Sequence, residues 1–275
     1  MQPRLLHIFR NTPLGRETLL QSIHFCRATG QKLYIYIPSE KKFMLYVGSK
    51  AIQVGLDSSY LADPDSAEKH CREILDSCNF VADFFQPGEY TASTLPDLHI
   101  DYEYLCCPRI ISDLSSKIGL GQIGTKVRHI LSEADFPVLI PSAVYKPWKS
   151  VTVFFGGSES AKSAVLLGHS LAQRAEVPFR IFTQDEGRGR EHYQTMIRDV
   201  LKENGAPEFE WKFFSAGNMR DNLFEVEHDT LAVLGTFGHH PIKKALFGSK
   251  MELIQSNLPN NLLLVGERCC FSGRS

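Results

Sequence analysis

Short apolar runs alternate with segments of helical periodicity along the whole chain. In the second half, the expected strands are 151–155, 179–182, 209–214, 231–234 and 261–265, and the expected helices are 160–175, 190–204, 219–226 and 250–257. A strand, a helix of several turns and a further strand favour a parallel, right-handed crossover. The sequence therefore predicts an α/β fold of open parallel, Rossmann-like sheets with helices on both faces.

The first half shows the same alternation with one interruption. Its expected strands are 5–9, 33–37, 80–85, 102–106 and 137–141, and its expected helices are 14–29, 65–78 and 125–134. Residues 43–56 break the alternation, because two β-rich runs flank a Gly-Ser-Lys turn, a pattern typical of a β-hairpin. Thr12 followed by Pro13 indicates an N-cap and the first helical position.

The two halves repeat each other. Aligning Gly30 with Glu176 superposes the first strands and helices without a gap, and aligning Gly124 with Gly248 superposes the last helix and strand. Repetition of this kind indicates that one α/β unit has been duplicated, and 275 residues suffice for two domains of about 100 to 150 residues. The predicted domains are residues 1–146 and 147–275.

The charge balance excludes one class of partner. The chain has 30 lysines and arginines against 31 aspartates and glutamates, for a net charge of -1. This balance gives no excess positive charge to attract nucleic acid or an anionic membrane surface. No apolar run approaches the roughly 18 residues needed to cross a bilayer. We therefore expect neither nucleic acid nor a membrane as a partner.

The cysteines and the first residues indicate the compartment. His7 and Arg10 occupy positions where a signal peptide would have its apolar core. An odd number of cysteines without C-x-x-C spacing fits neither a disulfide framework nor a zinc site. The seven are Cys26, Cys71, Cys78, Cys106, Cys107, Cys269 and Cys270. The sequence thus predicts a cytoplasmic protein with reduced thiols, most of them small buried hydrophobes.

One glycine-rich segment suits phosphate binding. An apolar strand leads into Gly235 and Gly238, and after nine intervening residues Gly248 and Ser249 begin a helix. Glycines can expose backbone amides at positive φ, and a helix N-terminus points unpaired N–H groups outward. A plain tight turn followed by a glycine at the helix entry would also explain Gly235 and Gly238, so both interpretations stand on the residues alone.

The complete pattern, Gly-x2-Gly-x9-Gly-Ser between a strand and a helix, resembles the nucleotide-binding signature of the universal stress protein family. The resemblance to a tandem member of this family extends over nearly the whole chain. It implies ATP or another adenine nucleotide, which Mg²⁺ could accompany. It places the phosphates at Gly235, Gly238, Gly248 and Ser249, and the nucleoside at Phe154, Gly156, Thr183 and Gln184.

The chain departs from the family pattern at the end of the first strand of each half. Family members that hold ATP usually carry an aspartate there, and this chain has Gly156 in the second half and Arg10 in the first. Loss of one charged hydrogen bond, about 1.5 to 3 kcal/mol, weakens binding by roughly one to two decades. In the first half, Cys106-Cys107-Pro108 also replaces the first glycines, so we expect that half to be structural.

The family commonly pairs two domains through their last strands. The resemblance therefore implies an intrachain pseudo-dimer through 137–140 and 261–265, and such chains could pair again as homodimers.

Other candidates for chemistry are weaker. His239 and His240 are adjacent but have no further metal ligands at suitable spacing, and the Gly-x-Gly-x-x-Gly of 119–124 follows no strand directly. No catalytic residues are assigned.

Three functions are consistent with the sequence: a nucleotide-binding regulatory or stress-response module with an unknown protein partner, a slow ATP-hydrolysing enzyme, and a scaffold that has lost the nucleotide. The missing carboxylate argues against the enzyme.

Overall fold

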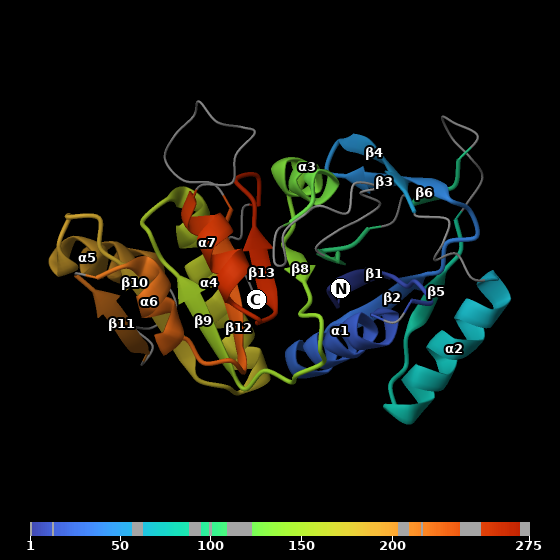
Figure 1. The fold of residues 1–275 in the computed structure, drawn as a ribbon, viewed down its shortest axis with the longest axis horizontal. Coiled ribbons are helices and arrows are strands. Elements are labelled where there is room, and N and C mark those ends of the chain that lie inside the picture. The colour runs from blue at the N-terminus through green and yellow to red at the C-terminus, as the bar shows by residue number, and fades with distance from the viewer. Residues whose placement is uncertain are drawn as a thin grey trace.

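The structure is a computed structural model that describes residues 2–12, 14–56, 63–87, 95–98, 101–108, 123–202, 209–215, 217–236 and 249–269. Ten of the described strands form one continuous sheet. In the first half these are β1 (Arg4–Ile8), β2 (Lys32–Tyr36), β5 (Asp83–Phe85), β7 (Tyr104–Cys106) and β8 (Val138–Ile140). In the second half they are β9 (Ser150–Phe154), β10 (Phe179–Gln184), β11 (Glu210–Phe214), β12 (Thr230–Gly235) and β13 (Leu262–Val265). The order across the sheet is β11-β10-β9-β12-β13-β8-β7-β1-β2-β5 (Figure 1).

The strands are parallel within each half and antiparallel where the halves meet. β8 pairs with β13 in antiparallel register, with Leu139 opposite Leu263. All other neighbours in this sheet are parallel. The predicted α/β architecture and the pairing of the two last strands are therefore present, and this pairing joins the halves into one sheet.

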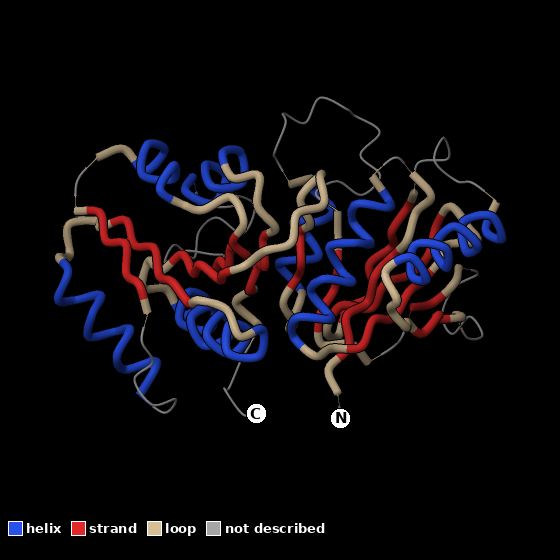
Figure 2. The backbone as a smooth tube through the Cα atoms, turned by 90° about the horizontal axis from the view of Figure 1, so that it is seen from below, coloured by secondary structure: helices blue, strands red, loops and turns tan. Residues whose placement is uncertain are grey.

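Helices cover both faces of the large sheet. α1 (Gly15–Thr29), α2 (Pro64–Ser77), α4 (Glu159–Ala175) and α5 (Arg190–Leu201) pack on one face. On the other face lie α3 (Thr125–Glu133), α6 (Met219–Asn222) with the 3-10 turn Leu223–Glu225, and α7 (Ser249–Asn257). Figure 2 shows helices on both sides of the strands, as expected for parallel strands that must bury both faces.

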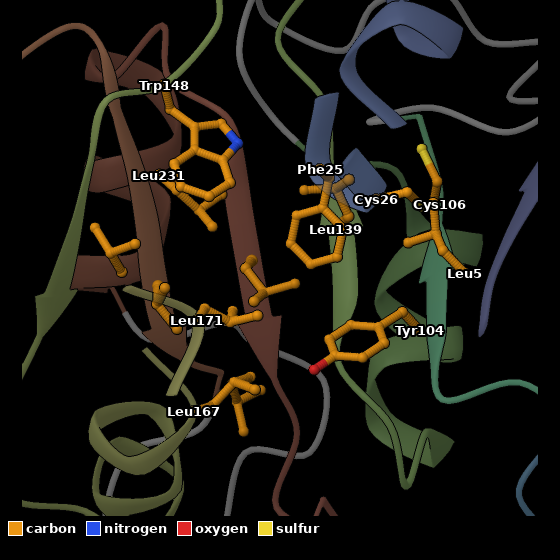
Figure 3. Close-up of a cluster of buried hydrophobic side chains, with 14 of the residues drawn as sticks. Leu5, Phe25, Cys26, Tyr104, Cys106, Leu139, Trp148, Leu167, Leu171 and Leu231 are labelled. Atoms are coloured by element: carbon orange, nitrogen blue, oxygen red, sulfur yellow. The ribbon is translucent and has the colours of Figure 1, made fainter. Parts of the chain in front are cut away.

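Both hydrophobic cores run across the junction between the halves. The core under α1 and α4 contains side chains from both halves, and so does the core on the opposite face. Figure 3 shows part of the first core, where Phe25 and Leu139 face Leu171 and Leu231. Neither half therefore buries its apolar surface alone.

A buried polar network joins α1 to the start of β13. Gln21 Nε2 donates to Ser142 Oγ at 2.8 Å, and Asn261 Nδ2 donates to Gln21 Oε1 at 2.9 Å. The backbone N–H of Ser142 donates to Asn261 Oδ1 at 2.9 Å. All three side chains are buried. Because each of these bonds satisfies a buried group, loss of one partner leaves others unpaired.

We expect Asn261→Ala to lower the free energy of unfolding by about 2 kcal/mol, because Gln21 Oε1 and the N–H of Ser142 would lose their partners inside the protein. Urea unfolding measures this loss as a lower midpoint at an unchanged slope. Asn257→Ala is the matched control, because Asn257 is exposed and its amide donates to the carbonyl of Leu253 and to Ser256 Oγ, both within its own helix. Equal effects of the two substitutions would contradict the role of the network.

A separate three-stranded sheet belongs to the first half. β3 (Lys42–Val47) and β4 (Lys50–Gly55) form the predicted antiparallel hairpin, and β6 (Asp97–Leu98) adds a short strand that the sequence does not predict. The sheet packs onto the face of the large sheet that carries Tyr36, whose ring lies 5.3 Å from that of Phe43. In the second half, α6 and the 3-10 turn cover this face instead.

Some local predictions need correction. Leu14, and not Thr12, is the N-cap of α1, and no side chain caps that helix. Pro13 lies outside the described residues. The strand predicted at 80–85 begins only at Asp83, because Cys78 and Asn79 form the turn that ends α2.

A buried histidine in β1 marks a difference between the halves. His7 Nδ1 lies 2.9 Å from Ser22 Oγ in α1, and among the described residues its Nε2 has no hydrogen-bond partner. On the gapless alignment, this pair corresponds to Val153 and Gly168. A Cβ built on Gly168 would lie 2.4 Å from Cγ2 of Val153, so the valine itself fills that space. The same strand–helix contact is polar in one half and apolar in the other.

Combining His7→Val with Ser22→Gly should therefore make folding less sensitive to acid. Burial, assisted by the charge of Arg10, lowers the pKa of His7 to about 3. As the pH falls from about 6.5 towards 3, the unfolded chain binds a proton that the native chain does not, so stability falls in that window. Urea unfolding at about pH 7 and about pH 4.5 should show a smaller loss for the double variant. An equal loss in both proteins would assign the acid sensitivity to other groups.

Candidate functional site

The candidate site lies between two neighbouring parallel strands of the second half whose following connections lead to opposite sides of the sheet order. β9 and β12 are adjacent, with Phe154 opposite Leu234, so Phe155 and Gly235 lie side by side at their carboxyl ends. From β9 the chain passes through α4 to β10 on one side, whereas β12 continues to α7 and β13 on the other. Such a switch point is where open α/β sheets form a crevice for ligands.

Gly235 is the last residue of β12 and has strand conformation, so the expectation of a positive φ is wrong for this glycine. The close approach of α4 explains the glycine instead. A Cβ at this position would lie 2.6 Å from the backbone nitrogen of Ala161 and 2.6 Å from the carbonyl carbon of Ser160. The absence of a side chain thus lets the N-terminus of α4 lie directly against the end of β12.

The turn from β9 into α4 is open. Gly156 is exposed, and no described atom lies within 4 Å of a Cβ built on it. Gly157 has φ +83°, and Ser158 caps α4 by accepting a hydrogen bond from the N–H of Ala161 at 3.2 Å. Among the described residues, none therefore obstructs a Cβ at the position where the chain lacks the carboxylate.

The two strand-end side chains predicted for the nucleoside face the interior. Phe154 is buried, and its ring lies 4.9 Å from that of Phe182. Thr183 has no exposed surface, and its Oγ1 accepts a hydrogen bond from Trp211 Nε1 at 3.1 Å. Side-chain contacts from these two residues to a ligand at the sheet edge are therefore not available in this arrangement, although Thr183 still holds the end of β10 in place.

Gln184 is half-buried at the end of β10 and has a fixed orientation. Its Oε1 accepts a hydrogen bond from Asn222 Nδ2 at 2.6 Å, and its Nε2 donates to the carbonyl of Phe214 at 3.4 Å. Of the four residues predicted for the nucleoside, Gly156 and Gln184 thus retain exposed surface at the carboxyl ends of the strands.

Part of the predicted phosphate segment lies outside the described residues. This applies to Gly238 and Gly248, and also to His239 and His240. Ser249 is the first residue of α7, and its side chain is not described.

Sequence reasoning missed the role of Asp185, which follows β10 directly. Its Oδ1 accepts hydrogen bonds from the N–H groups of Gly187, Arg188 and Gly189 at 3.0, 2.9 and 3.2 Å. An aspartate before Gly-x-Gly is the available signal, because Asp side chains readily accept bonds from the following backbone in turns. This carboxylate therefore shapes the loop that leads into α5.

The equivalent edge of the first half carries two buried thiols in place of glycines. Cys106 and Cys107 are both buried, and burial raises the pKa of Cys106 to about 12. Such thiols stay protonated at neutral pH and are poor nucleophiles. Within the described ranges, no group of three or more His, Cys, Asp or Glu residues could hold a metal ion, and no described helix is long and apolar enough to cross a membrane.

Comparison with known proteins defines the fold. No protein-family model and no curated protein matches the sequence. Among solved structures, a universal stress protein from Archaeoglobus fulgidus DSM 4304 matches 96% of this chain and 98% of its own, at 14% identity and a TM-score of 0.62. The chain has the universal stress protein fold.

Other structures share this fold. A putative universal stress protein from Pseudomonas aeruginosa UCBPP-PA14 matches 96% of this chain and 93% of its own, at 12% identity and a TM-score of 0.58. The cytoplasmic domain of a prokaryotic cation chloride cotransporter matches 99% and 98%, at 10% identity and a TM-score of 0.54. Because the universal stress protein fold occurs in proteins with different roles, function must be argued from the site.

Proposed function

We propose that this chain is a nucleotide-binding regulatory module that binds ATP, or another adenine nucleotide, in its second half and signals occupancy to a protein partner. The observation that carries the proposal is the glycine-containing edge at the β9–β12 switch point. There, the start of α4 abuts Gly235, and no described atom lies within 4 Å of a Cβ built on Gly156. Backbone N–H groups at a helix start and in a glycine turn favour anionic groups such as phosphates.

The proposed contacts divide between backbone and side chains. Gly235, Gly238, Gly248 and Ser249 would surround the phosphates, and any Mg²⁺ would be held through these phosphates. Gly156 and Gln184 would lie beside the nucleoside, with Phe154 and Thr183 supporting the strands from inside. The first half, residues 1–146, would act as the structural partner of residues 147–275 in a tandem pseudo-dimer.

Native mass spectrometry of the purified protein, followed by acid release of any ligand, tests the proposal. We expect an adenine nucleotide at one per chain, or binding of added ATP by calorimetry, without steady turnover. Sustained hydrolysis above background would favour the slow ATPase. If the protein purifies without a nucleotide and binds none of ATP, ADP, AMP and adenosine, the proposal is wrong and the chain is better described as a scaffold that has lost the nucleotide.

A further inference from the structure

The small sheet of the first half reaches the ligand edge of the second half through α3. Because β8 and β13 are antiparallel, the carboxyl end of β13 lies beside the amino end of β8 and the C-terminus of α3. A Cβ on Gly266 would lie 3.0 Å from the carbonyl oxygen of Leu131 and 3.1 Å from that of Ala134. Figure 1 shows α3 between β13 and β4. The hairpin therefore lies on the same side of the molecule as the candidate site.

The candidate site is tied directly to the end of β13. Thr236, the residue after β12, donates from its backbone N–H to the carbonyl of Val265 at 2.9 Å and from its Oγ1 to the same oxygen at 3.1 Å. Thr236 is 2% exposed. These two hydrogen bonds therefore connect the start of the segment after β12 directly to Val265.

A shared carboxylate connects the end of β13 to the hairpin. Arg268 Nη1 lies 2.6 Å from Glu133 Oε2 in α3, and Lys50 Nζ at the start of β4 lies 2.9 Å from the same oxygen. The Glu133 side chain is only 11% exposed, whereas those of Lys50 and Arg268 are about half exposed. One carboxylate thus holds two cations, one from the hairpin and one from the residues after β13.

We propose that Arg268 is shared between Glu133 and the phosphates of a nucleotide bound at the carboxyl ends of β9 and β12, so that nucleotide binding is coupled to the β3–β4 hairpin. The inference rests on the proposed function. A polyphosphate carries more charge than one carboxylate and offers Arg a bidentate contact. When Arg268 turns to the phosphates, Glu133 keeps Lys50 as its charged partner, and this pair holds the hairpin more tightly.

The coupling requires that Glu133 and the nucleotide compete for Arg268. Removing the carboxylate should therefore strengthen nucleotide binding, and removing the guanidinium should weaken it. The affinity for adenosine, which has no phosphate, should not change in either variant. By thermodynamic reciprocity, a change at Glu133 that alters ATP affinity also alters how ATP affects the hairpin.

Calorimetry with ATP and with adenosine tests the inference on three variants of the full chain. Arg268→Met should raise the Kd for ATP about tenfold and leave the Kd for adenosine unchanged. Glu133→Gln should lower the Kd for ATP severalfold. Arg180→Met is the matched control, because Arg180 also bridges two carboxylates, those of Glu210 and Glu227, but at the amino end of β10. Unchanged adenosine binding shows that each variant is folded.

Hydrogen exchange gives a second readout. ATP should slow amide exchange in β4 of the wild type, and adenosine should not. If Arg268→Met binds ATP with the same Kd as the wild type, and ATP does not change the rate of amide exchange in β4 of the wild type, the inference is wrong while the proposed function stands. If the wild type binds neither ATP nor adenosine, the proposed function fails and this inference fails with it.

Discussion

Gly156→Asp should tighten the binding of an adenine nucleotide by about one to two orders of magnitude. Gly156 is exposed after the end of β9, and no described atom lies within 4 Å of a Cβ built on it. The carboxylate would stand where ATP-holding members of the family that this chain resembles carry an aspartate. A charged hydrogen bond to the nucleoside contributes about 1.5 to 3 kcal/mol, which is the origin of the expected change.

Calorimetric titration with ATP and with adenosine checks this gain. Both ligands should bind more tightly, because the new contact is to the nucleoside and not to the phosphates. Gly156→Asn is the matched control: it has nearly the same shape, lacks the charge and should gain less. If Gly156→Asp binds ATP no better than the wild type, the nucleoside does not lie beside β9, and the proposed assignment of the site is wrong.

Gly235→Ala should lower the free energy of unfolding by about 3 kcal/mol, the upper range for overpacking. The added Cβ would lie 2.6 Å from two backbone atoms of α4, at Ser160 and Ala161, so the helix itself must move. Because α4 opens beside the candidate site, nucleotide affinity should fall as well.

Urea unfolding and calorimetry together measure both effects. Gly156→Ala provides the comparison, since its Cβ meets no described atom and its effect on stability should stay within about 0.5 kcal/mol. If Gly235→Ala were as stable as Gly156→Ala, the close contact between β12 and α4 would not explain the glycine.

Much of the architecture is predictable because it depends on local pattern. Strand-helix alternation predicts the parallel crossovers, and the turn at Gly48 predicts the hairpin of β3 and β4. β6 escapes prediction because two residues carry no periodicity, and its partner β3 lies some fifty residues earlier in the chain.

The candidate site is less predictable because side-chain direction depends on packing. Phe154 and Thr183 both lie at strand ends, yet the ring of Phe154 joins one core while Thr183 is covered by Trp211. The motif predicts Gly235 as part of a phosphate-binding turn, whereas the structure explains this glycine by its contact with the start of α4. That contact joins residues 75 positions apart in the sequence, so a local motif does not reveal it. By contrast, the role of Asp185 could have been predicted locally, because Gly187 and Gly189 follow it closely in the sequence and donate to its side chain.

The antiparallel pairing of β8 with β13 also makes formation of the complete sheet independent of protein concentration. Its strand register spans three residue pairs, and both cores continue through it. Two separate chains joined in this way would dissociate on dilution, because their association depends on concentration. A single chain closes the same contact within itself, at an effective concentration fixed by the linker between the halves. The complete sheet therefore forms even where a cell holds only a few copies of the protein.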